Sequence, residues 1–452
     1  MTEVRARVAQ GVLIRRREGG VDRYLGVPYA APPVCALRWR APELPTPWRE
    51  PREALAFGPD SLQPPFPGWD GSRGAGMNED CLYLNVWAPA EARDAPVLVV
   101  IHGGGFQLLS GAYDAFDGSR LAAEGVVVVT FNYRLGLLGF SGGSWWLRDQ
   151  IAALAWVQAN IAAFGGAADR VTIIGVSAGG VSVNALTISP AARGLFCQAI
   201  SVSGAGGSLF TLADHPPQPA LGDAPPVYAS AFATGAGELP VVDGDLIPAL
   251  PSQALRKGAS NAARLVVVFS TGEGSLLDEL DVPTDALAQA LLAQTPAAER
   301  GPVTPDAQAL YSHLVFRQPA LALADAAADA GAPTYVADYD ALPAAARGAL
   351  RSAGHGAALY DILGNPNPSP AIAALAGDPQ DDRHSAGFRR RVLNFVRGGP
   401  PDGADGPSWP LHAAGQPRAL RIDRTGEPSI GPVLGLQDLA ALRDLNRQDH
   451  TS

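Results

Sequence analysis

The sequence predicts an α/β fold with a mostly parallel central sheet and helices on both faces. Short, near-continuously apolar runs rich in β-branched residues recur along the chain, which is typical of strands buried on both faces. Helical segments separate these runs. Alternation of strand and helix indicates a parallel sheet that is covered on both sides.

Five segments have the composition of buried strands. They are residues 97–102, 126–131, 171–175, 265–270 and 334–339. Between the second and third lies the segment 147–166, in which Ile151, Leu154, Val157 and Ile161 recur at helical spacing before a glycine pair. This spacing predicts a helix that ends at the glycines.

Proline- and glycine-rich stretches at 62–76, 214–226, 364–371 and 398–410 are typical of loops. No internal repeat and no clear linker divides the chain. We therefore predict one domain over residues 1–452, with surface insertions.

Composition and motifs exclude several function classes. The net charge of −10 argues against a nucleic-acid partner. Walker, H-E-x-x-H, Cys-x-x-Cys and Gly-x-Gly-x-x-Gly patterns are absent from the sequence, which disfavours nucleotide, metal and dinucleotide chemistry. We expect no cofactor and no metal.

The cysteine content and the apolar pattern bear on location. Three cysteines, Cys35, Cys81 and Cys197, are too few for a disulfide framework and favour a reducing compartment. The first residues lack the apolar core of a signal peptide, and no apolar run approaches the ~20 residues of a membrane span. We expect a cytoplasmic protein, a monomer or homodimer, without a membrane partner.

The stretch "GVSAG" places Ser177 between a buried strand and a predicted helix, as in a nucleophile elbow. In such a turn the serine adopts strained φ/ψ angles, and Gly175 and Gly179 let strand and helix approach closely. The alternative is that Ser177 only caps the helix.

A nucleophilic serine needs amide donors for the oxyanion. Three glycines, Gly103, Gly104 and Gly105, directly follow the first predicted strand, and their amides can point at a developing negative charge. The amide of Ala178 would be the partner donor. The alternative is a glycine-rich turn without a role.

The base is sought among seven histidines: His102, His215, His313, His355, His384, His412 and His450. In enzymes with a nucleophile elbow the catalytic residues follow along the chain in the order serine, acid, histidine, which excludes His102. His215 comes too soon after Ser177 to leave room for the strand that would carry the acid. The last two lie in the C-terminal tail, and His313 and His384 are surface candidates. His355 lies between two glycines, which give its loop freedom to approach the serine.

The acid should follow a strand between serine and histidine, where it can orient the imidazole. Glu273 comes just after the strand predicted at 265–270. The competing carboxylates read as exposed turn residues: Asp278, Glu279, Asp243 and Asp245.

Several segments resemble those of one family. "YLGVPYAAPPVCALRWRAPE", "NEDCLYLNVWAP", "IHGGGF", "FNYRLGLLGF" and "VTIIGVSAGGVSV" look like the blocks of type-B carboxylesterases, the cholinesterase-like branch of the α/β-hydrolase fold. The likeness runs from about Gly11 to about Ile422.

The resemblance implies particular roles. Ser177, Glu273 and His355 would form the catalytic triad, and Gly104, Gly105 and Ala178 the oxyanion hole. "TGEG" stands where the family commonly has Asp-Glu-Gly, which favours Glu273. The same analogy implies that Arg134 and Asp149 form a structural ion pair without a catalytic role.

The sequence also departs from the family pattern. Val176 stands where the family has Glu, which lowers the negative potential near the serine and disfavours a cationic, choline-like substrate. Ser61 stands at a cysteine position, so we expect Cys81 to be a free thiol.

The spacing between Ser177 and Glu273 is 273 − 177 = 96 positions, shorter than in many relatives. Residues 220–239 are rich in Pro, Gly and Ala. We therefore predict a reduced cap region and a more open gorge suited to a bulky ester.

Phe106, Val176, Trp145 and Trp146 are candidate pocket residues. The alternative for the aromatic residues is that they pack in the core or at the rim.

The predicted function is hydrolysis of a small-molecule carboxylic ester through an acyl-enzyme. Two alternatives stay open. One is an acyltransferase or lactone-processing enzyme of a biosynthetic pathway that uses the same triad. The other is a non-catalytic binding module on an esterase scaffold, although such modules typically lose the nucleophile.

Overall fold

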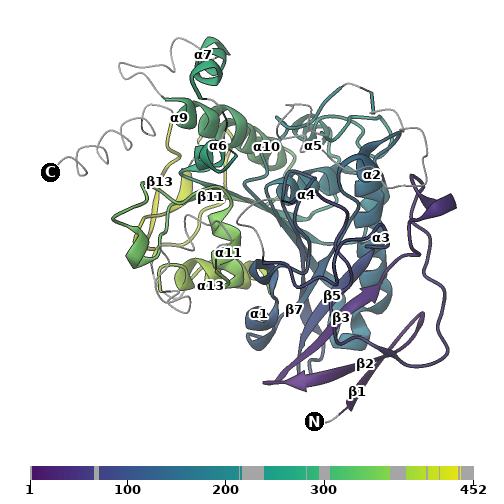
Figure 1. The fold of residues 1–452 in the computed structure, drawn as a ribbon. Helices are drawn as coiled ribbons and strands as arrows, with labels where there is room; N and C mark the ends of the chain where they lie inside the picture. Colours follow the sequence, from purple (N-terminus) through teal and green to yellow (C-terminus); the bar gives the residue numbers. More distant parts are fainter. Residues whose placement is uncertain are drawn as a thin grey trace.

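The computed structural model describes residues 3–65, 71–212, 214–215, 239–280, 282, 284–294, 306–366, 383–403, 406–416, 418–435 and 438. Within these residues thirteen strands form one sheet through the middle of the molecule (Figure 1). The strands are β1 (Glu3–Val8), β2 (Gly11–Glu18), β3 (Val21–Pro28), β4 (Arg52–Glu53), β5 (Tyr83–Pro89), β6 (Ala95–Ile101), β7 (Val127–Phe131), β8 (Gly166–Val176), β9 (Gln198–Val202), β10 (Arg264–Ser270), β11 (Thr334–Tyr339), β12 (Arg418–Ile422) and β13 (Pro428–Pro432).

The centre of the sheet is parallel and its two ends are antiparallel. The strands follow the order β1-β2-β3-β5-β7-β6-β8-β9-β10-β11-β12-β13, with β4 beside β2. All pairs from β7 to β12 are parallel. The pairs at both ends of the path, from β1 to β7 and from β12 to β13, are antiparallel. The predicted mostly parallel central sheet is confirmed.

The five predicted strands correspond to β6, β7, β8, β10 and β11. The antiparallel strands at both ends were not predicted, and neither was β9. That strand is short and includes glutamine and serine, yet all five of its residues are buried. Its place between β8 and β10 makes it a central strand.

Helices flank the sheet. They are α1 (Ser119–Ala123), α2 (Gly136–Phe140), α3 (Trp145–Asn160), α4 (Ala178–Ile188), α5 (Pro251–Arg256), α6 (Leu276–Glu279), α7 (Thr284–Gln294), α9 (Ala307–Tyr311), α10 (Gln318–Asp329), α11 (Ala357–Leu363) and α13 (Ala386–Val396). The predicted helix over 147–166 is α3 followed by a 3₁₀ turn, Ile161–Phe164. It ends at Gly165, whose φ of 76° allows the chain to leave the helix.

Two apolar cores lie on opposite faces of the sheet. In β6, Val97, Val99 and Ile101 join a core with residues of α3 and α4. The alternating Leu98 and Val100 join a second core with residues of α11 and α13. Because successive side chains of a strand point to opposite faces, helices cover both sides of the sheet, as predicted (Figure 1).

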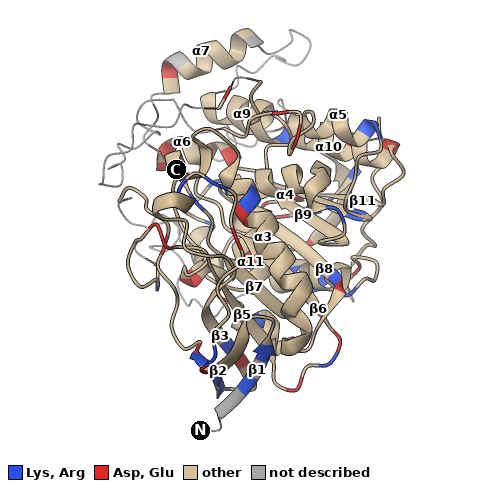
Figure 2. Cartoon of the chain, turned by 90° about the vertical axis from the view of Figure 1, so that its right-hand side faces the viewer, with Lys and Arg blue, Asp and Glu red and all other residues tan. Residues whose placement is uncertain are grey.

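Basic and acidic residues are interspersed in the view of Figure 2. No described helix is both long and apolar enough to span a bilayer.

The cysteines are free, and burial raises the pKa of the Cys81 thiol to about 12. The expectation of a free thiol at Cys81 is confirmed.

The segment 220–239, for which a reduced cap was predicted, lies outside the described residues except for Leu239. The reduced cap stays a prediction.

A buried ion pair fixes the chain after β7 against α3. The guanidinium of Arg134 donates two hydrogen bonds to the carboxylate of Asp149, at 2.8 Å and 2.7 Å. The backbone amide of Arg134 donates a third at 3.0 Å. The side chains are only 1% and 0% exposed. The expected Arg134–Asp149 pair is confirmed.

Asp149→Ala should lower the free energy of unfolding by about 3–5 kcal/mol, because it leaves the buried Arg134 without its counter-charge. Asp94→Ala is the control. It removes an exposed pair with Arg170, whose side chains are 38% and 81% exposed, and should cost less than about 1 kcal/mol. Urea denaturation measures both, and equal small losses would contradict the structural role of the buried pair.

Candidate active site

Ser177 lies on the turn between β8 and α4, at the carboxyl edge of the parallel strands. Its φ and ψ are 56° and −123°, a strained combination for a residue with a side chain. Hydrogen bonds hold the turn on both sides. The Ser177 amide donates to the carbonyl of Val202 at 3.0 Å, and the Ser177 carbonyl accepts from the amide of Val181 at 2.9 Å.

The glycines beside the serine are required by backbone contacts. A Cβ atom at Gly175 would overlap the carbonyl of Gly179, and one at Gly179 would overlap the carbonyl of Ile101. The close approach expected at both positions is confirmed. The Ser177 side chain makes no capping hydrogen bond to α4, so the alternative role as a helix cap is wrong.

The glycine loop after β6 lies against this turn. A Cβ atom at Gly103 would be 3.2 Å from Cβ of Ser177. Gly104 and Gly105 have φ of 97° and 60°. Among the hydrogen bonds of the described residues, none uses the amide of Gly104 or Gly105. The amide of Ala178, in the first turn of α4, has no intrahelical acceptor.

His102 contacts the glycine loop through the Gly103 carbonyl, and the sequence analysis assigned it no role. Its ring stacks on Tyr133 at 4.4 Å between centroids, and burial lowers its pKa to about 4. The ring is therefore neutral at pH 7. Its Nδ1 lies 2.9 Å from the carbonyl of Gly103, which can only accept, so Nδ1 carries the proton. The signal was present in the sequence, since His102 directly precedes the three glycines.

Glu273 and His355 form a buried pair across the carboxyl edge of the sheet. Nδ1 of His355 lies 2.6 Å from Oε2 of Glu273, and the side chains are 8% and 1% exposed. The other carboxylate oxygen, Oε1, accepts a hydrogen bond from the amide of Ser270 at 2.7 Å. The last residue of β10 thus holds the acid, and the acid orients the imidazole.

The His355 loop also touches the serine turn. A Cβ atom at Gly356 would be 2.7 Å from Cγ2 of Val176, the residue before Ser177. The ring of Phe316 packs on the His355 ring at 4.9 Å. Nε2 of His355 is buried and has no hydrogen-bond partner among the described residues. The structure therefore brings Glu273 and His355 together and places the His355 loop beside the turn of Ser177, without a hydrogen bond between His355 and Ser177.

Two other histidines have carboxylate partners of their own. His384 is buried, with Nε2 3.2 Å from Asp361, so its prediction as a surface residue is wrong. His412 is also buried, with Nε2 2.7 Å from Asp325. Both are satisfied by tertiary contacts that their charged or loop-rich sequence neighbourhoods did not reveal.

Most of the carboxylates that competed with Glu273 as the acid are exposed, as expected. Asp243, Asp245 and Asp278 are exposed, and Asp243 accepts hydrogen bonds from the amides of Asp245 and Ile247. Glu279 is half-buried in α6, so for this residue the expectation of an exposed turn is wrong.

The aromatic candidates pack mainly in the core. Trp146 is completely buried, stacked on Phe140 at 5.5 Å and in contact with Phe106 at 4.9 Å. Phe106 is 3% exposed. Trp145 is half-buried, and its Nε1 donates to the carbonyl of Ser141. These contacts favour the core alternative for Trp146 and Phe106.

No group of three or more His, Cys, Asp or Glu side chains that could hold a metal ion occurs in the part of the chain that the structure describes.

Comparisons with known proteins place the chain in a family. Residues 8–222 match the model of the carboxylesterase family. The chain is 33% identical to a fumonisin B1 esterase of Sphingopyxis macrogoltabida over 91% of its length and 83% of that protein. It is 32% identical to the para-nitrobenzyl esterase of Bacillus subtilis (strain 168), over 90% of its own length and 92% of that protein.

A solved structure agrees. A carboxylesterase of Geobacillus stearothermophilus superposes with a TM-score of 0.77 and 30% identity, covering 97% of this chain and 99% of that one. The chain belongs to the carboxylesterase family and has its α/β-hydrolase fold. It is a carboxylic ester hydrolase.

Gly179→Ala should prevent stable folding or lower the melting temperature by several °C, because several kcal/mol of overlap with the Ile101 carbonyl would distort the turn. Gly387→Ala is a matched control, since Gly387 is likewise the second residue of a helix but has open space around its Cβ position. It should leave stability unchanged or raise it by up to about 1 kcal/mol. Thermal unfolding separates the two, and a well-folded Gly179→Ala protein would contradict the steric account.

Proposed function

We propose that the chain hydrolyses carboxylic esters through an acyl-enzyme on Ser177, with His355 as general base and Glu273 as its orienting acid. The observation that carries this proposal is the buried 2.6 Å contact between Nδ1 of His355 and Oε2 of Glu273. It gives the imidazole a fixed tautomer, with the proton on Nδ1 and a lone pair on Nε2. Nε2 has no hydrogen-bond partner among the described residues, so its lone pair is available to accept the proton of the serine hydroxyl.

The reaction proceeds in two halves. Oγ of Ser177 attacks the ester carbonyl while Nε2 of His355 takes its proton, and the tetrahedral intermediate collapses as the same proton passes to the departing alcohol. Water then attacks the acyl-enzyme, again giving its proton to Nε2. The carboxylic acid leaves and the proton returns to Oγ. Throughout, Glu273 stabilises the imidazolium.

The oxyanion would be bound by the amides of Gly104, Gly105 and Ala178. The support is the contact between the glycine loop and Ser177, together with the two loop amides that no other described group uses. The neutral His102 keeps the loop in place through the Gly103 carbonyl. Each such donor is typically worth about 10²–10³ in rate.

Acyl transfer requires the same residues and differs only in the acceptor that attacks the acyl-enzyme. The relatives' names favour hydrolysis, since both are called esterases. A retained serine elbow, a buried histidine–glutamate pair and an available glycine loop do not favour a non-catalytic binding module.

We propose a neutral ester as the substrate. Val176 is 2% exposed and lies between the glycine loop and the His355 loop. An apolar side chain at this position offers no counter-charge for a quaternary ammonium group.

The three free cysteines support a reducing, cytoplasmic location.

Ser177→Ala and His355→Ala should each lower kcat for p-nitrophenyl acetate by at least about 10³-fold, because either change removes the activated nucleophile. His412→Ala is the matched control, since it breaks a second histidine–carboxylate pair of similar length, in which the imidazole is buried. It should keep kcat within about threefold. A fluorophosphonate probe should label the wild type and not Ser177→Ala. Undiminished hydrolysis by Ser177→Ala would refute the proposed nucleophile.

A choline ester and its neutral 3,3-dimethylbutyl isostere should have kcat/KM values that favour the neutral ester or differ by less than about threefold, because the site has no anionic partner at position 176. Steady-state kinetics with the two esters of one acid measures the ratio. A preference of more than tenfold for the cationic ester would mean that another carboxylate faces the leaving group.

A further inference from the structure

The segment that carries His355 is irregular, and three other elements form hydrogen bonds with it. From the turn between β12 and β13, Nη2 of Arg424 donates to the carbonyl of Leu350 at 2.6 Å. From the end of β11, Oδ1 of Asp340 accepts from the amide of Ala353 at 2.8 Å. From the Glu273 turn, Oγ of Ser275 accepts from the amide of His355 itself at 3.1 Å.

Asp340 is the residue best placed to transmit the rigidity of the sheet. It directly follows β11, and its own amide donates to the carbonyl of Ile422, the last residue of β12, at 2.9 Å. Its backbone is therefore fixed by the sheet. Ala353, which it binds, is two residues before His355, and the carbonyl of Ala353 accepts from the amide of Gly272, next to Glu273, at 2.9 Å.

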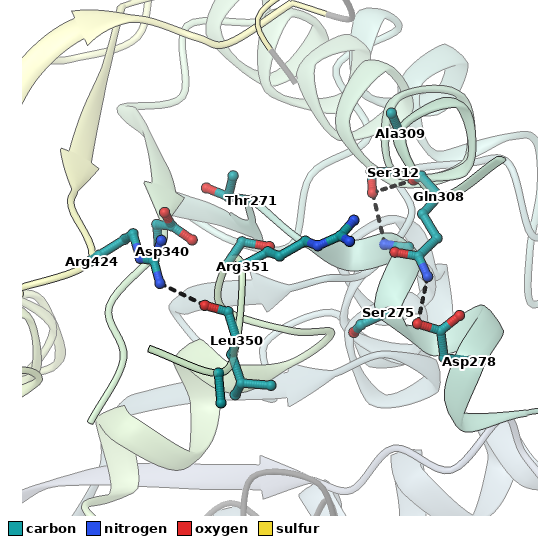
Figure 3. Close-up of a pocket in the computed structure, with 14 residues that line it drawn as sticks. Thr271, Ser275, Asp278, Gln308, Ala309, Ser312, Asp340, Leu350, Arg351 and Arg424 are labelled. Carbon is teal, nitrogen blue, oxygen red and sulfur yellow. Dashed lines mark hydrogen bonds between the residues drawn. The ribbon is translucent and has the colours of Figure 1, made fainter. Parts of the chain in front are cut away.

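A cavity of about 460 Å³ lies on this side of the segment (Figure 3). Its lining includes Asp340 and Arg424 on one side and Ser275 on the other, with Leu350 and Ser352 from the His355 segment. Side chains packed against a loop would resist its movement, but an open cavity does not. On this side the hydrogen bonds therefore account for most of the positioning of the segment.

We propose that Asp340 is a positioning residue for the reaction: by binding the Ala353 amide, it sets the place of His355 between Glu273 and Ser177. Ser275 acts at the same loop from the opposite side of the cavity. The inference rests on the proposed role of His355 as general base. Neither Asp340 nor Ser275 touches the reacting atoms.

The role requires an acceptor oxygen and not a charge. Burial, helped by the neighbouring carboxylate of Asp338, raises the pKa of Asp340 to about 7 despite the nearby guanidinium groups of Arg424 and Arg317. A protonated carboxyl retains a carbonyl oxygen that accepts the Ala353 amide, and an asparagine side chain has the same oxygen. Asp340→Asn should therefore keep the hydrogen bond to the Ala353 amide, and Asp340→Ala should remove it.

The experiment compares Asp340→Ala, Asp340→Asn and Ser275→Ala with wild type, by steady-state hydrolysis of p-nitrophenyl acetate and by thermal unfolding. Because misplacement of a catalytic group by about 1 Å costs up to about 10² in rate, kcat should fall at least about tenfold in Asp340→Ala. kcat/KM should fall equally, as expected for loss of an interaction that acts on the transition state. Asp340→Asn should stay within about threefold of wild type, and Ser275→Ala should lose kcat like Asp340→Ala.

Asp402→Ala is the matched control. Oδ1 of Asp402 also accepts a backbone amide, that of Trp409, at 2.8 Å, but at the loop that packs Trp409 against β11 away from His355. It should lose a similar amount of melting temperature and retain kcat. If Asp340→Ala does not fold, Ser275→Ala and Asp340→Asn carry the comparison.

Two results would overturn the proposal. One is wild-type kcat in a folded Asp340→Ala or, where that protein does not fold, in Ser275→Ala. The other is loss of kcat in Asp340→Asn as large as in Asp340→Ala. Failure of the proposed triad is recognised separately, because Ser177→Ala would then still hydrolyse the ester.

Discussion

The site depends on one strained residue. Ser177 keeps its unfavourable backbone angles only because β8 and α4 are packed backbone against backbone, through Gly175 and Gly179, with Ile101 of β6 directly beneath. The cost of the strain, of order 1–3 kcal/mol, is offset by the packing of a central strand and a fully buried helix. Ser177 lies at the edge where the parallel strands end, and its side chain makes no capping hydrogen bond to α4.

The other residues of the proposed site lie at the same edge of the sheet. Parallel strands end on the same side of a sheet, so the residues that follow β6, β8, β10 and β11 meet there although the chain between them is long. The glycine loop follows β6, the serine follows β8 and Glu273 follows β10. Asp340 follows β11 and holds the segment of His355. One topological rule thus explains both the proposed catalytic residues and the proposed positioning residue.

Two histidines show how surroundings give one residue type different tasks. His102 is buried against Tyr133 without a carboxylate, so burial lowers its pKa to about 4 and it serves as a neutral donor to the Gly103 carbonyl. His355 has Glu273 at one nitrogen and an unused second nitrogen. Only the second arrangement can accept a proton from a hydroxyl and stabilise the resulting cation.

The sequence by itself determined the local features. Runs of β-branched residues predicted five central strands, and "GVSAG" and the three glycines after β6 predicted the serine turn and its donor loop, because these depend on neighbours in the chain. Only the tertiary structure decided what lies beside what. The short β9 is a central strand because it pairs with β8 and β10. His384 is buried beside the carboxylate of Asp361, and Trp146 packs in the core. The 2.6 Å contact between residues 82 positions apart and the bond from Asp340 to the Ala353 amide depend on how the strands are ordered in the sheet, which local composition does not encode.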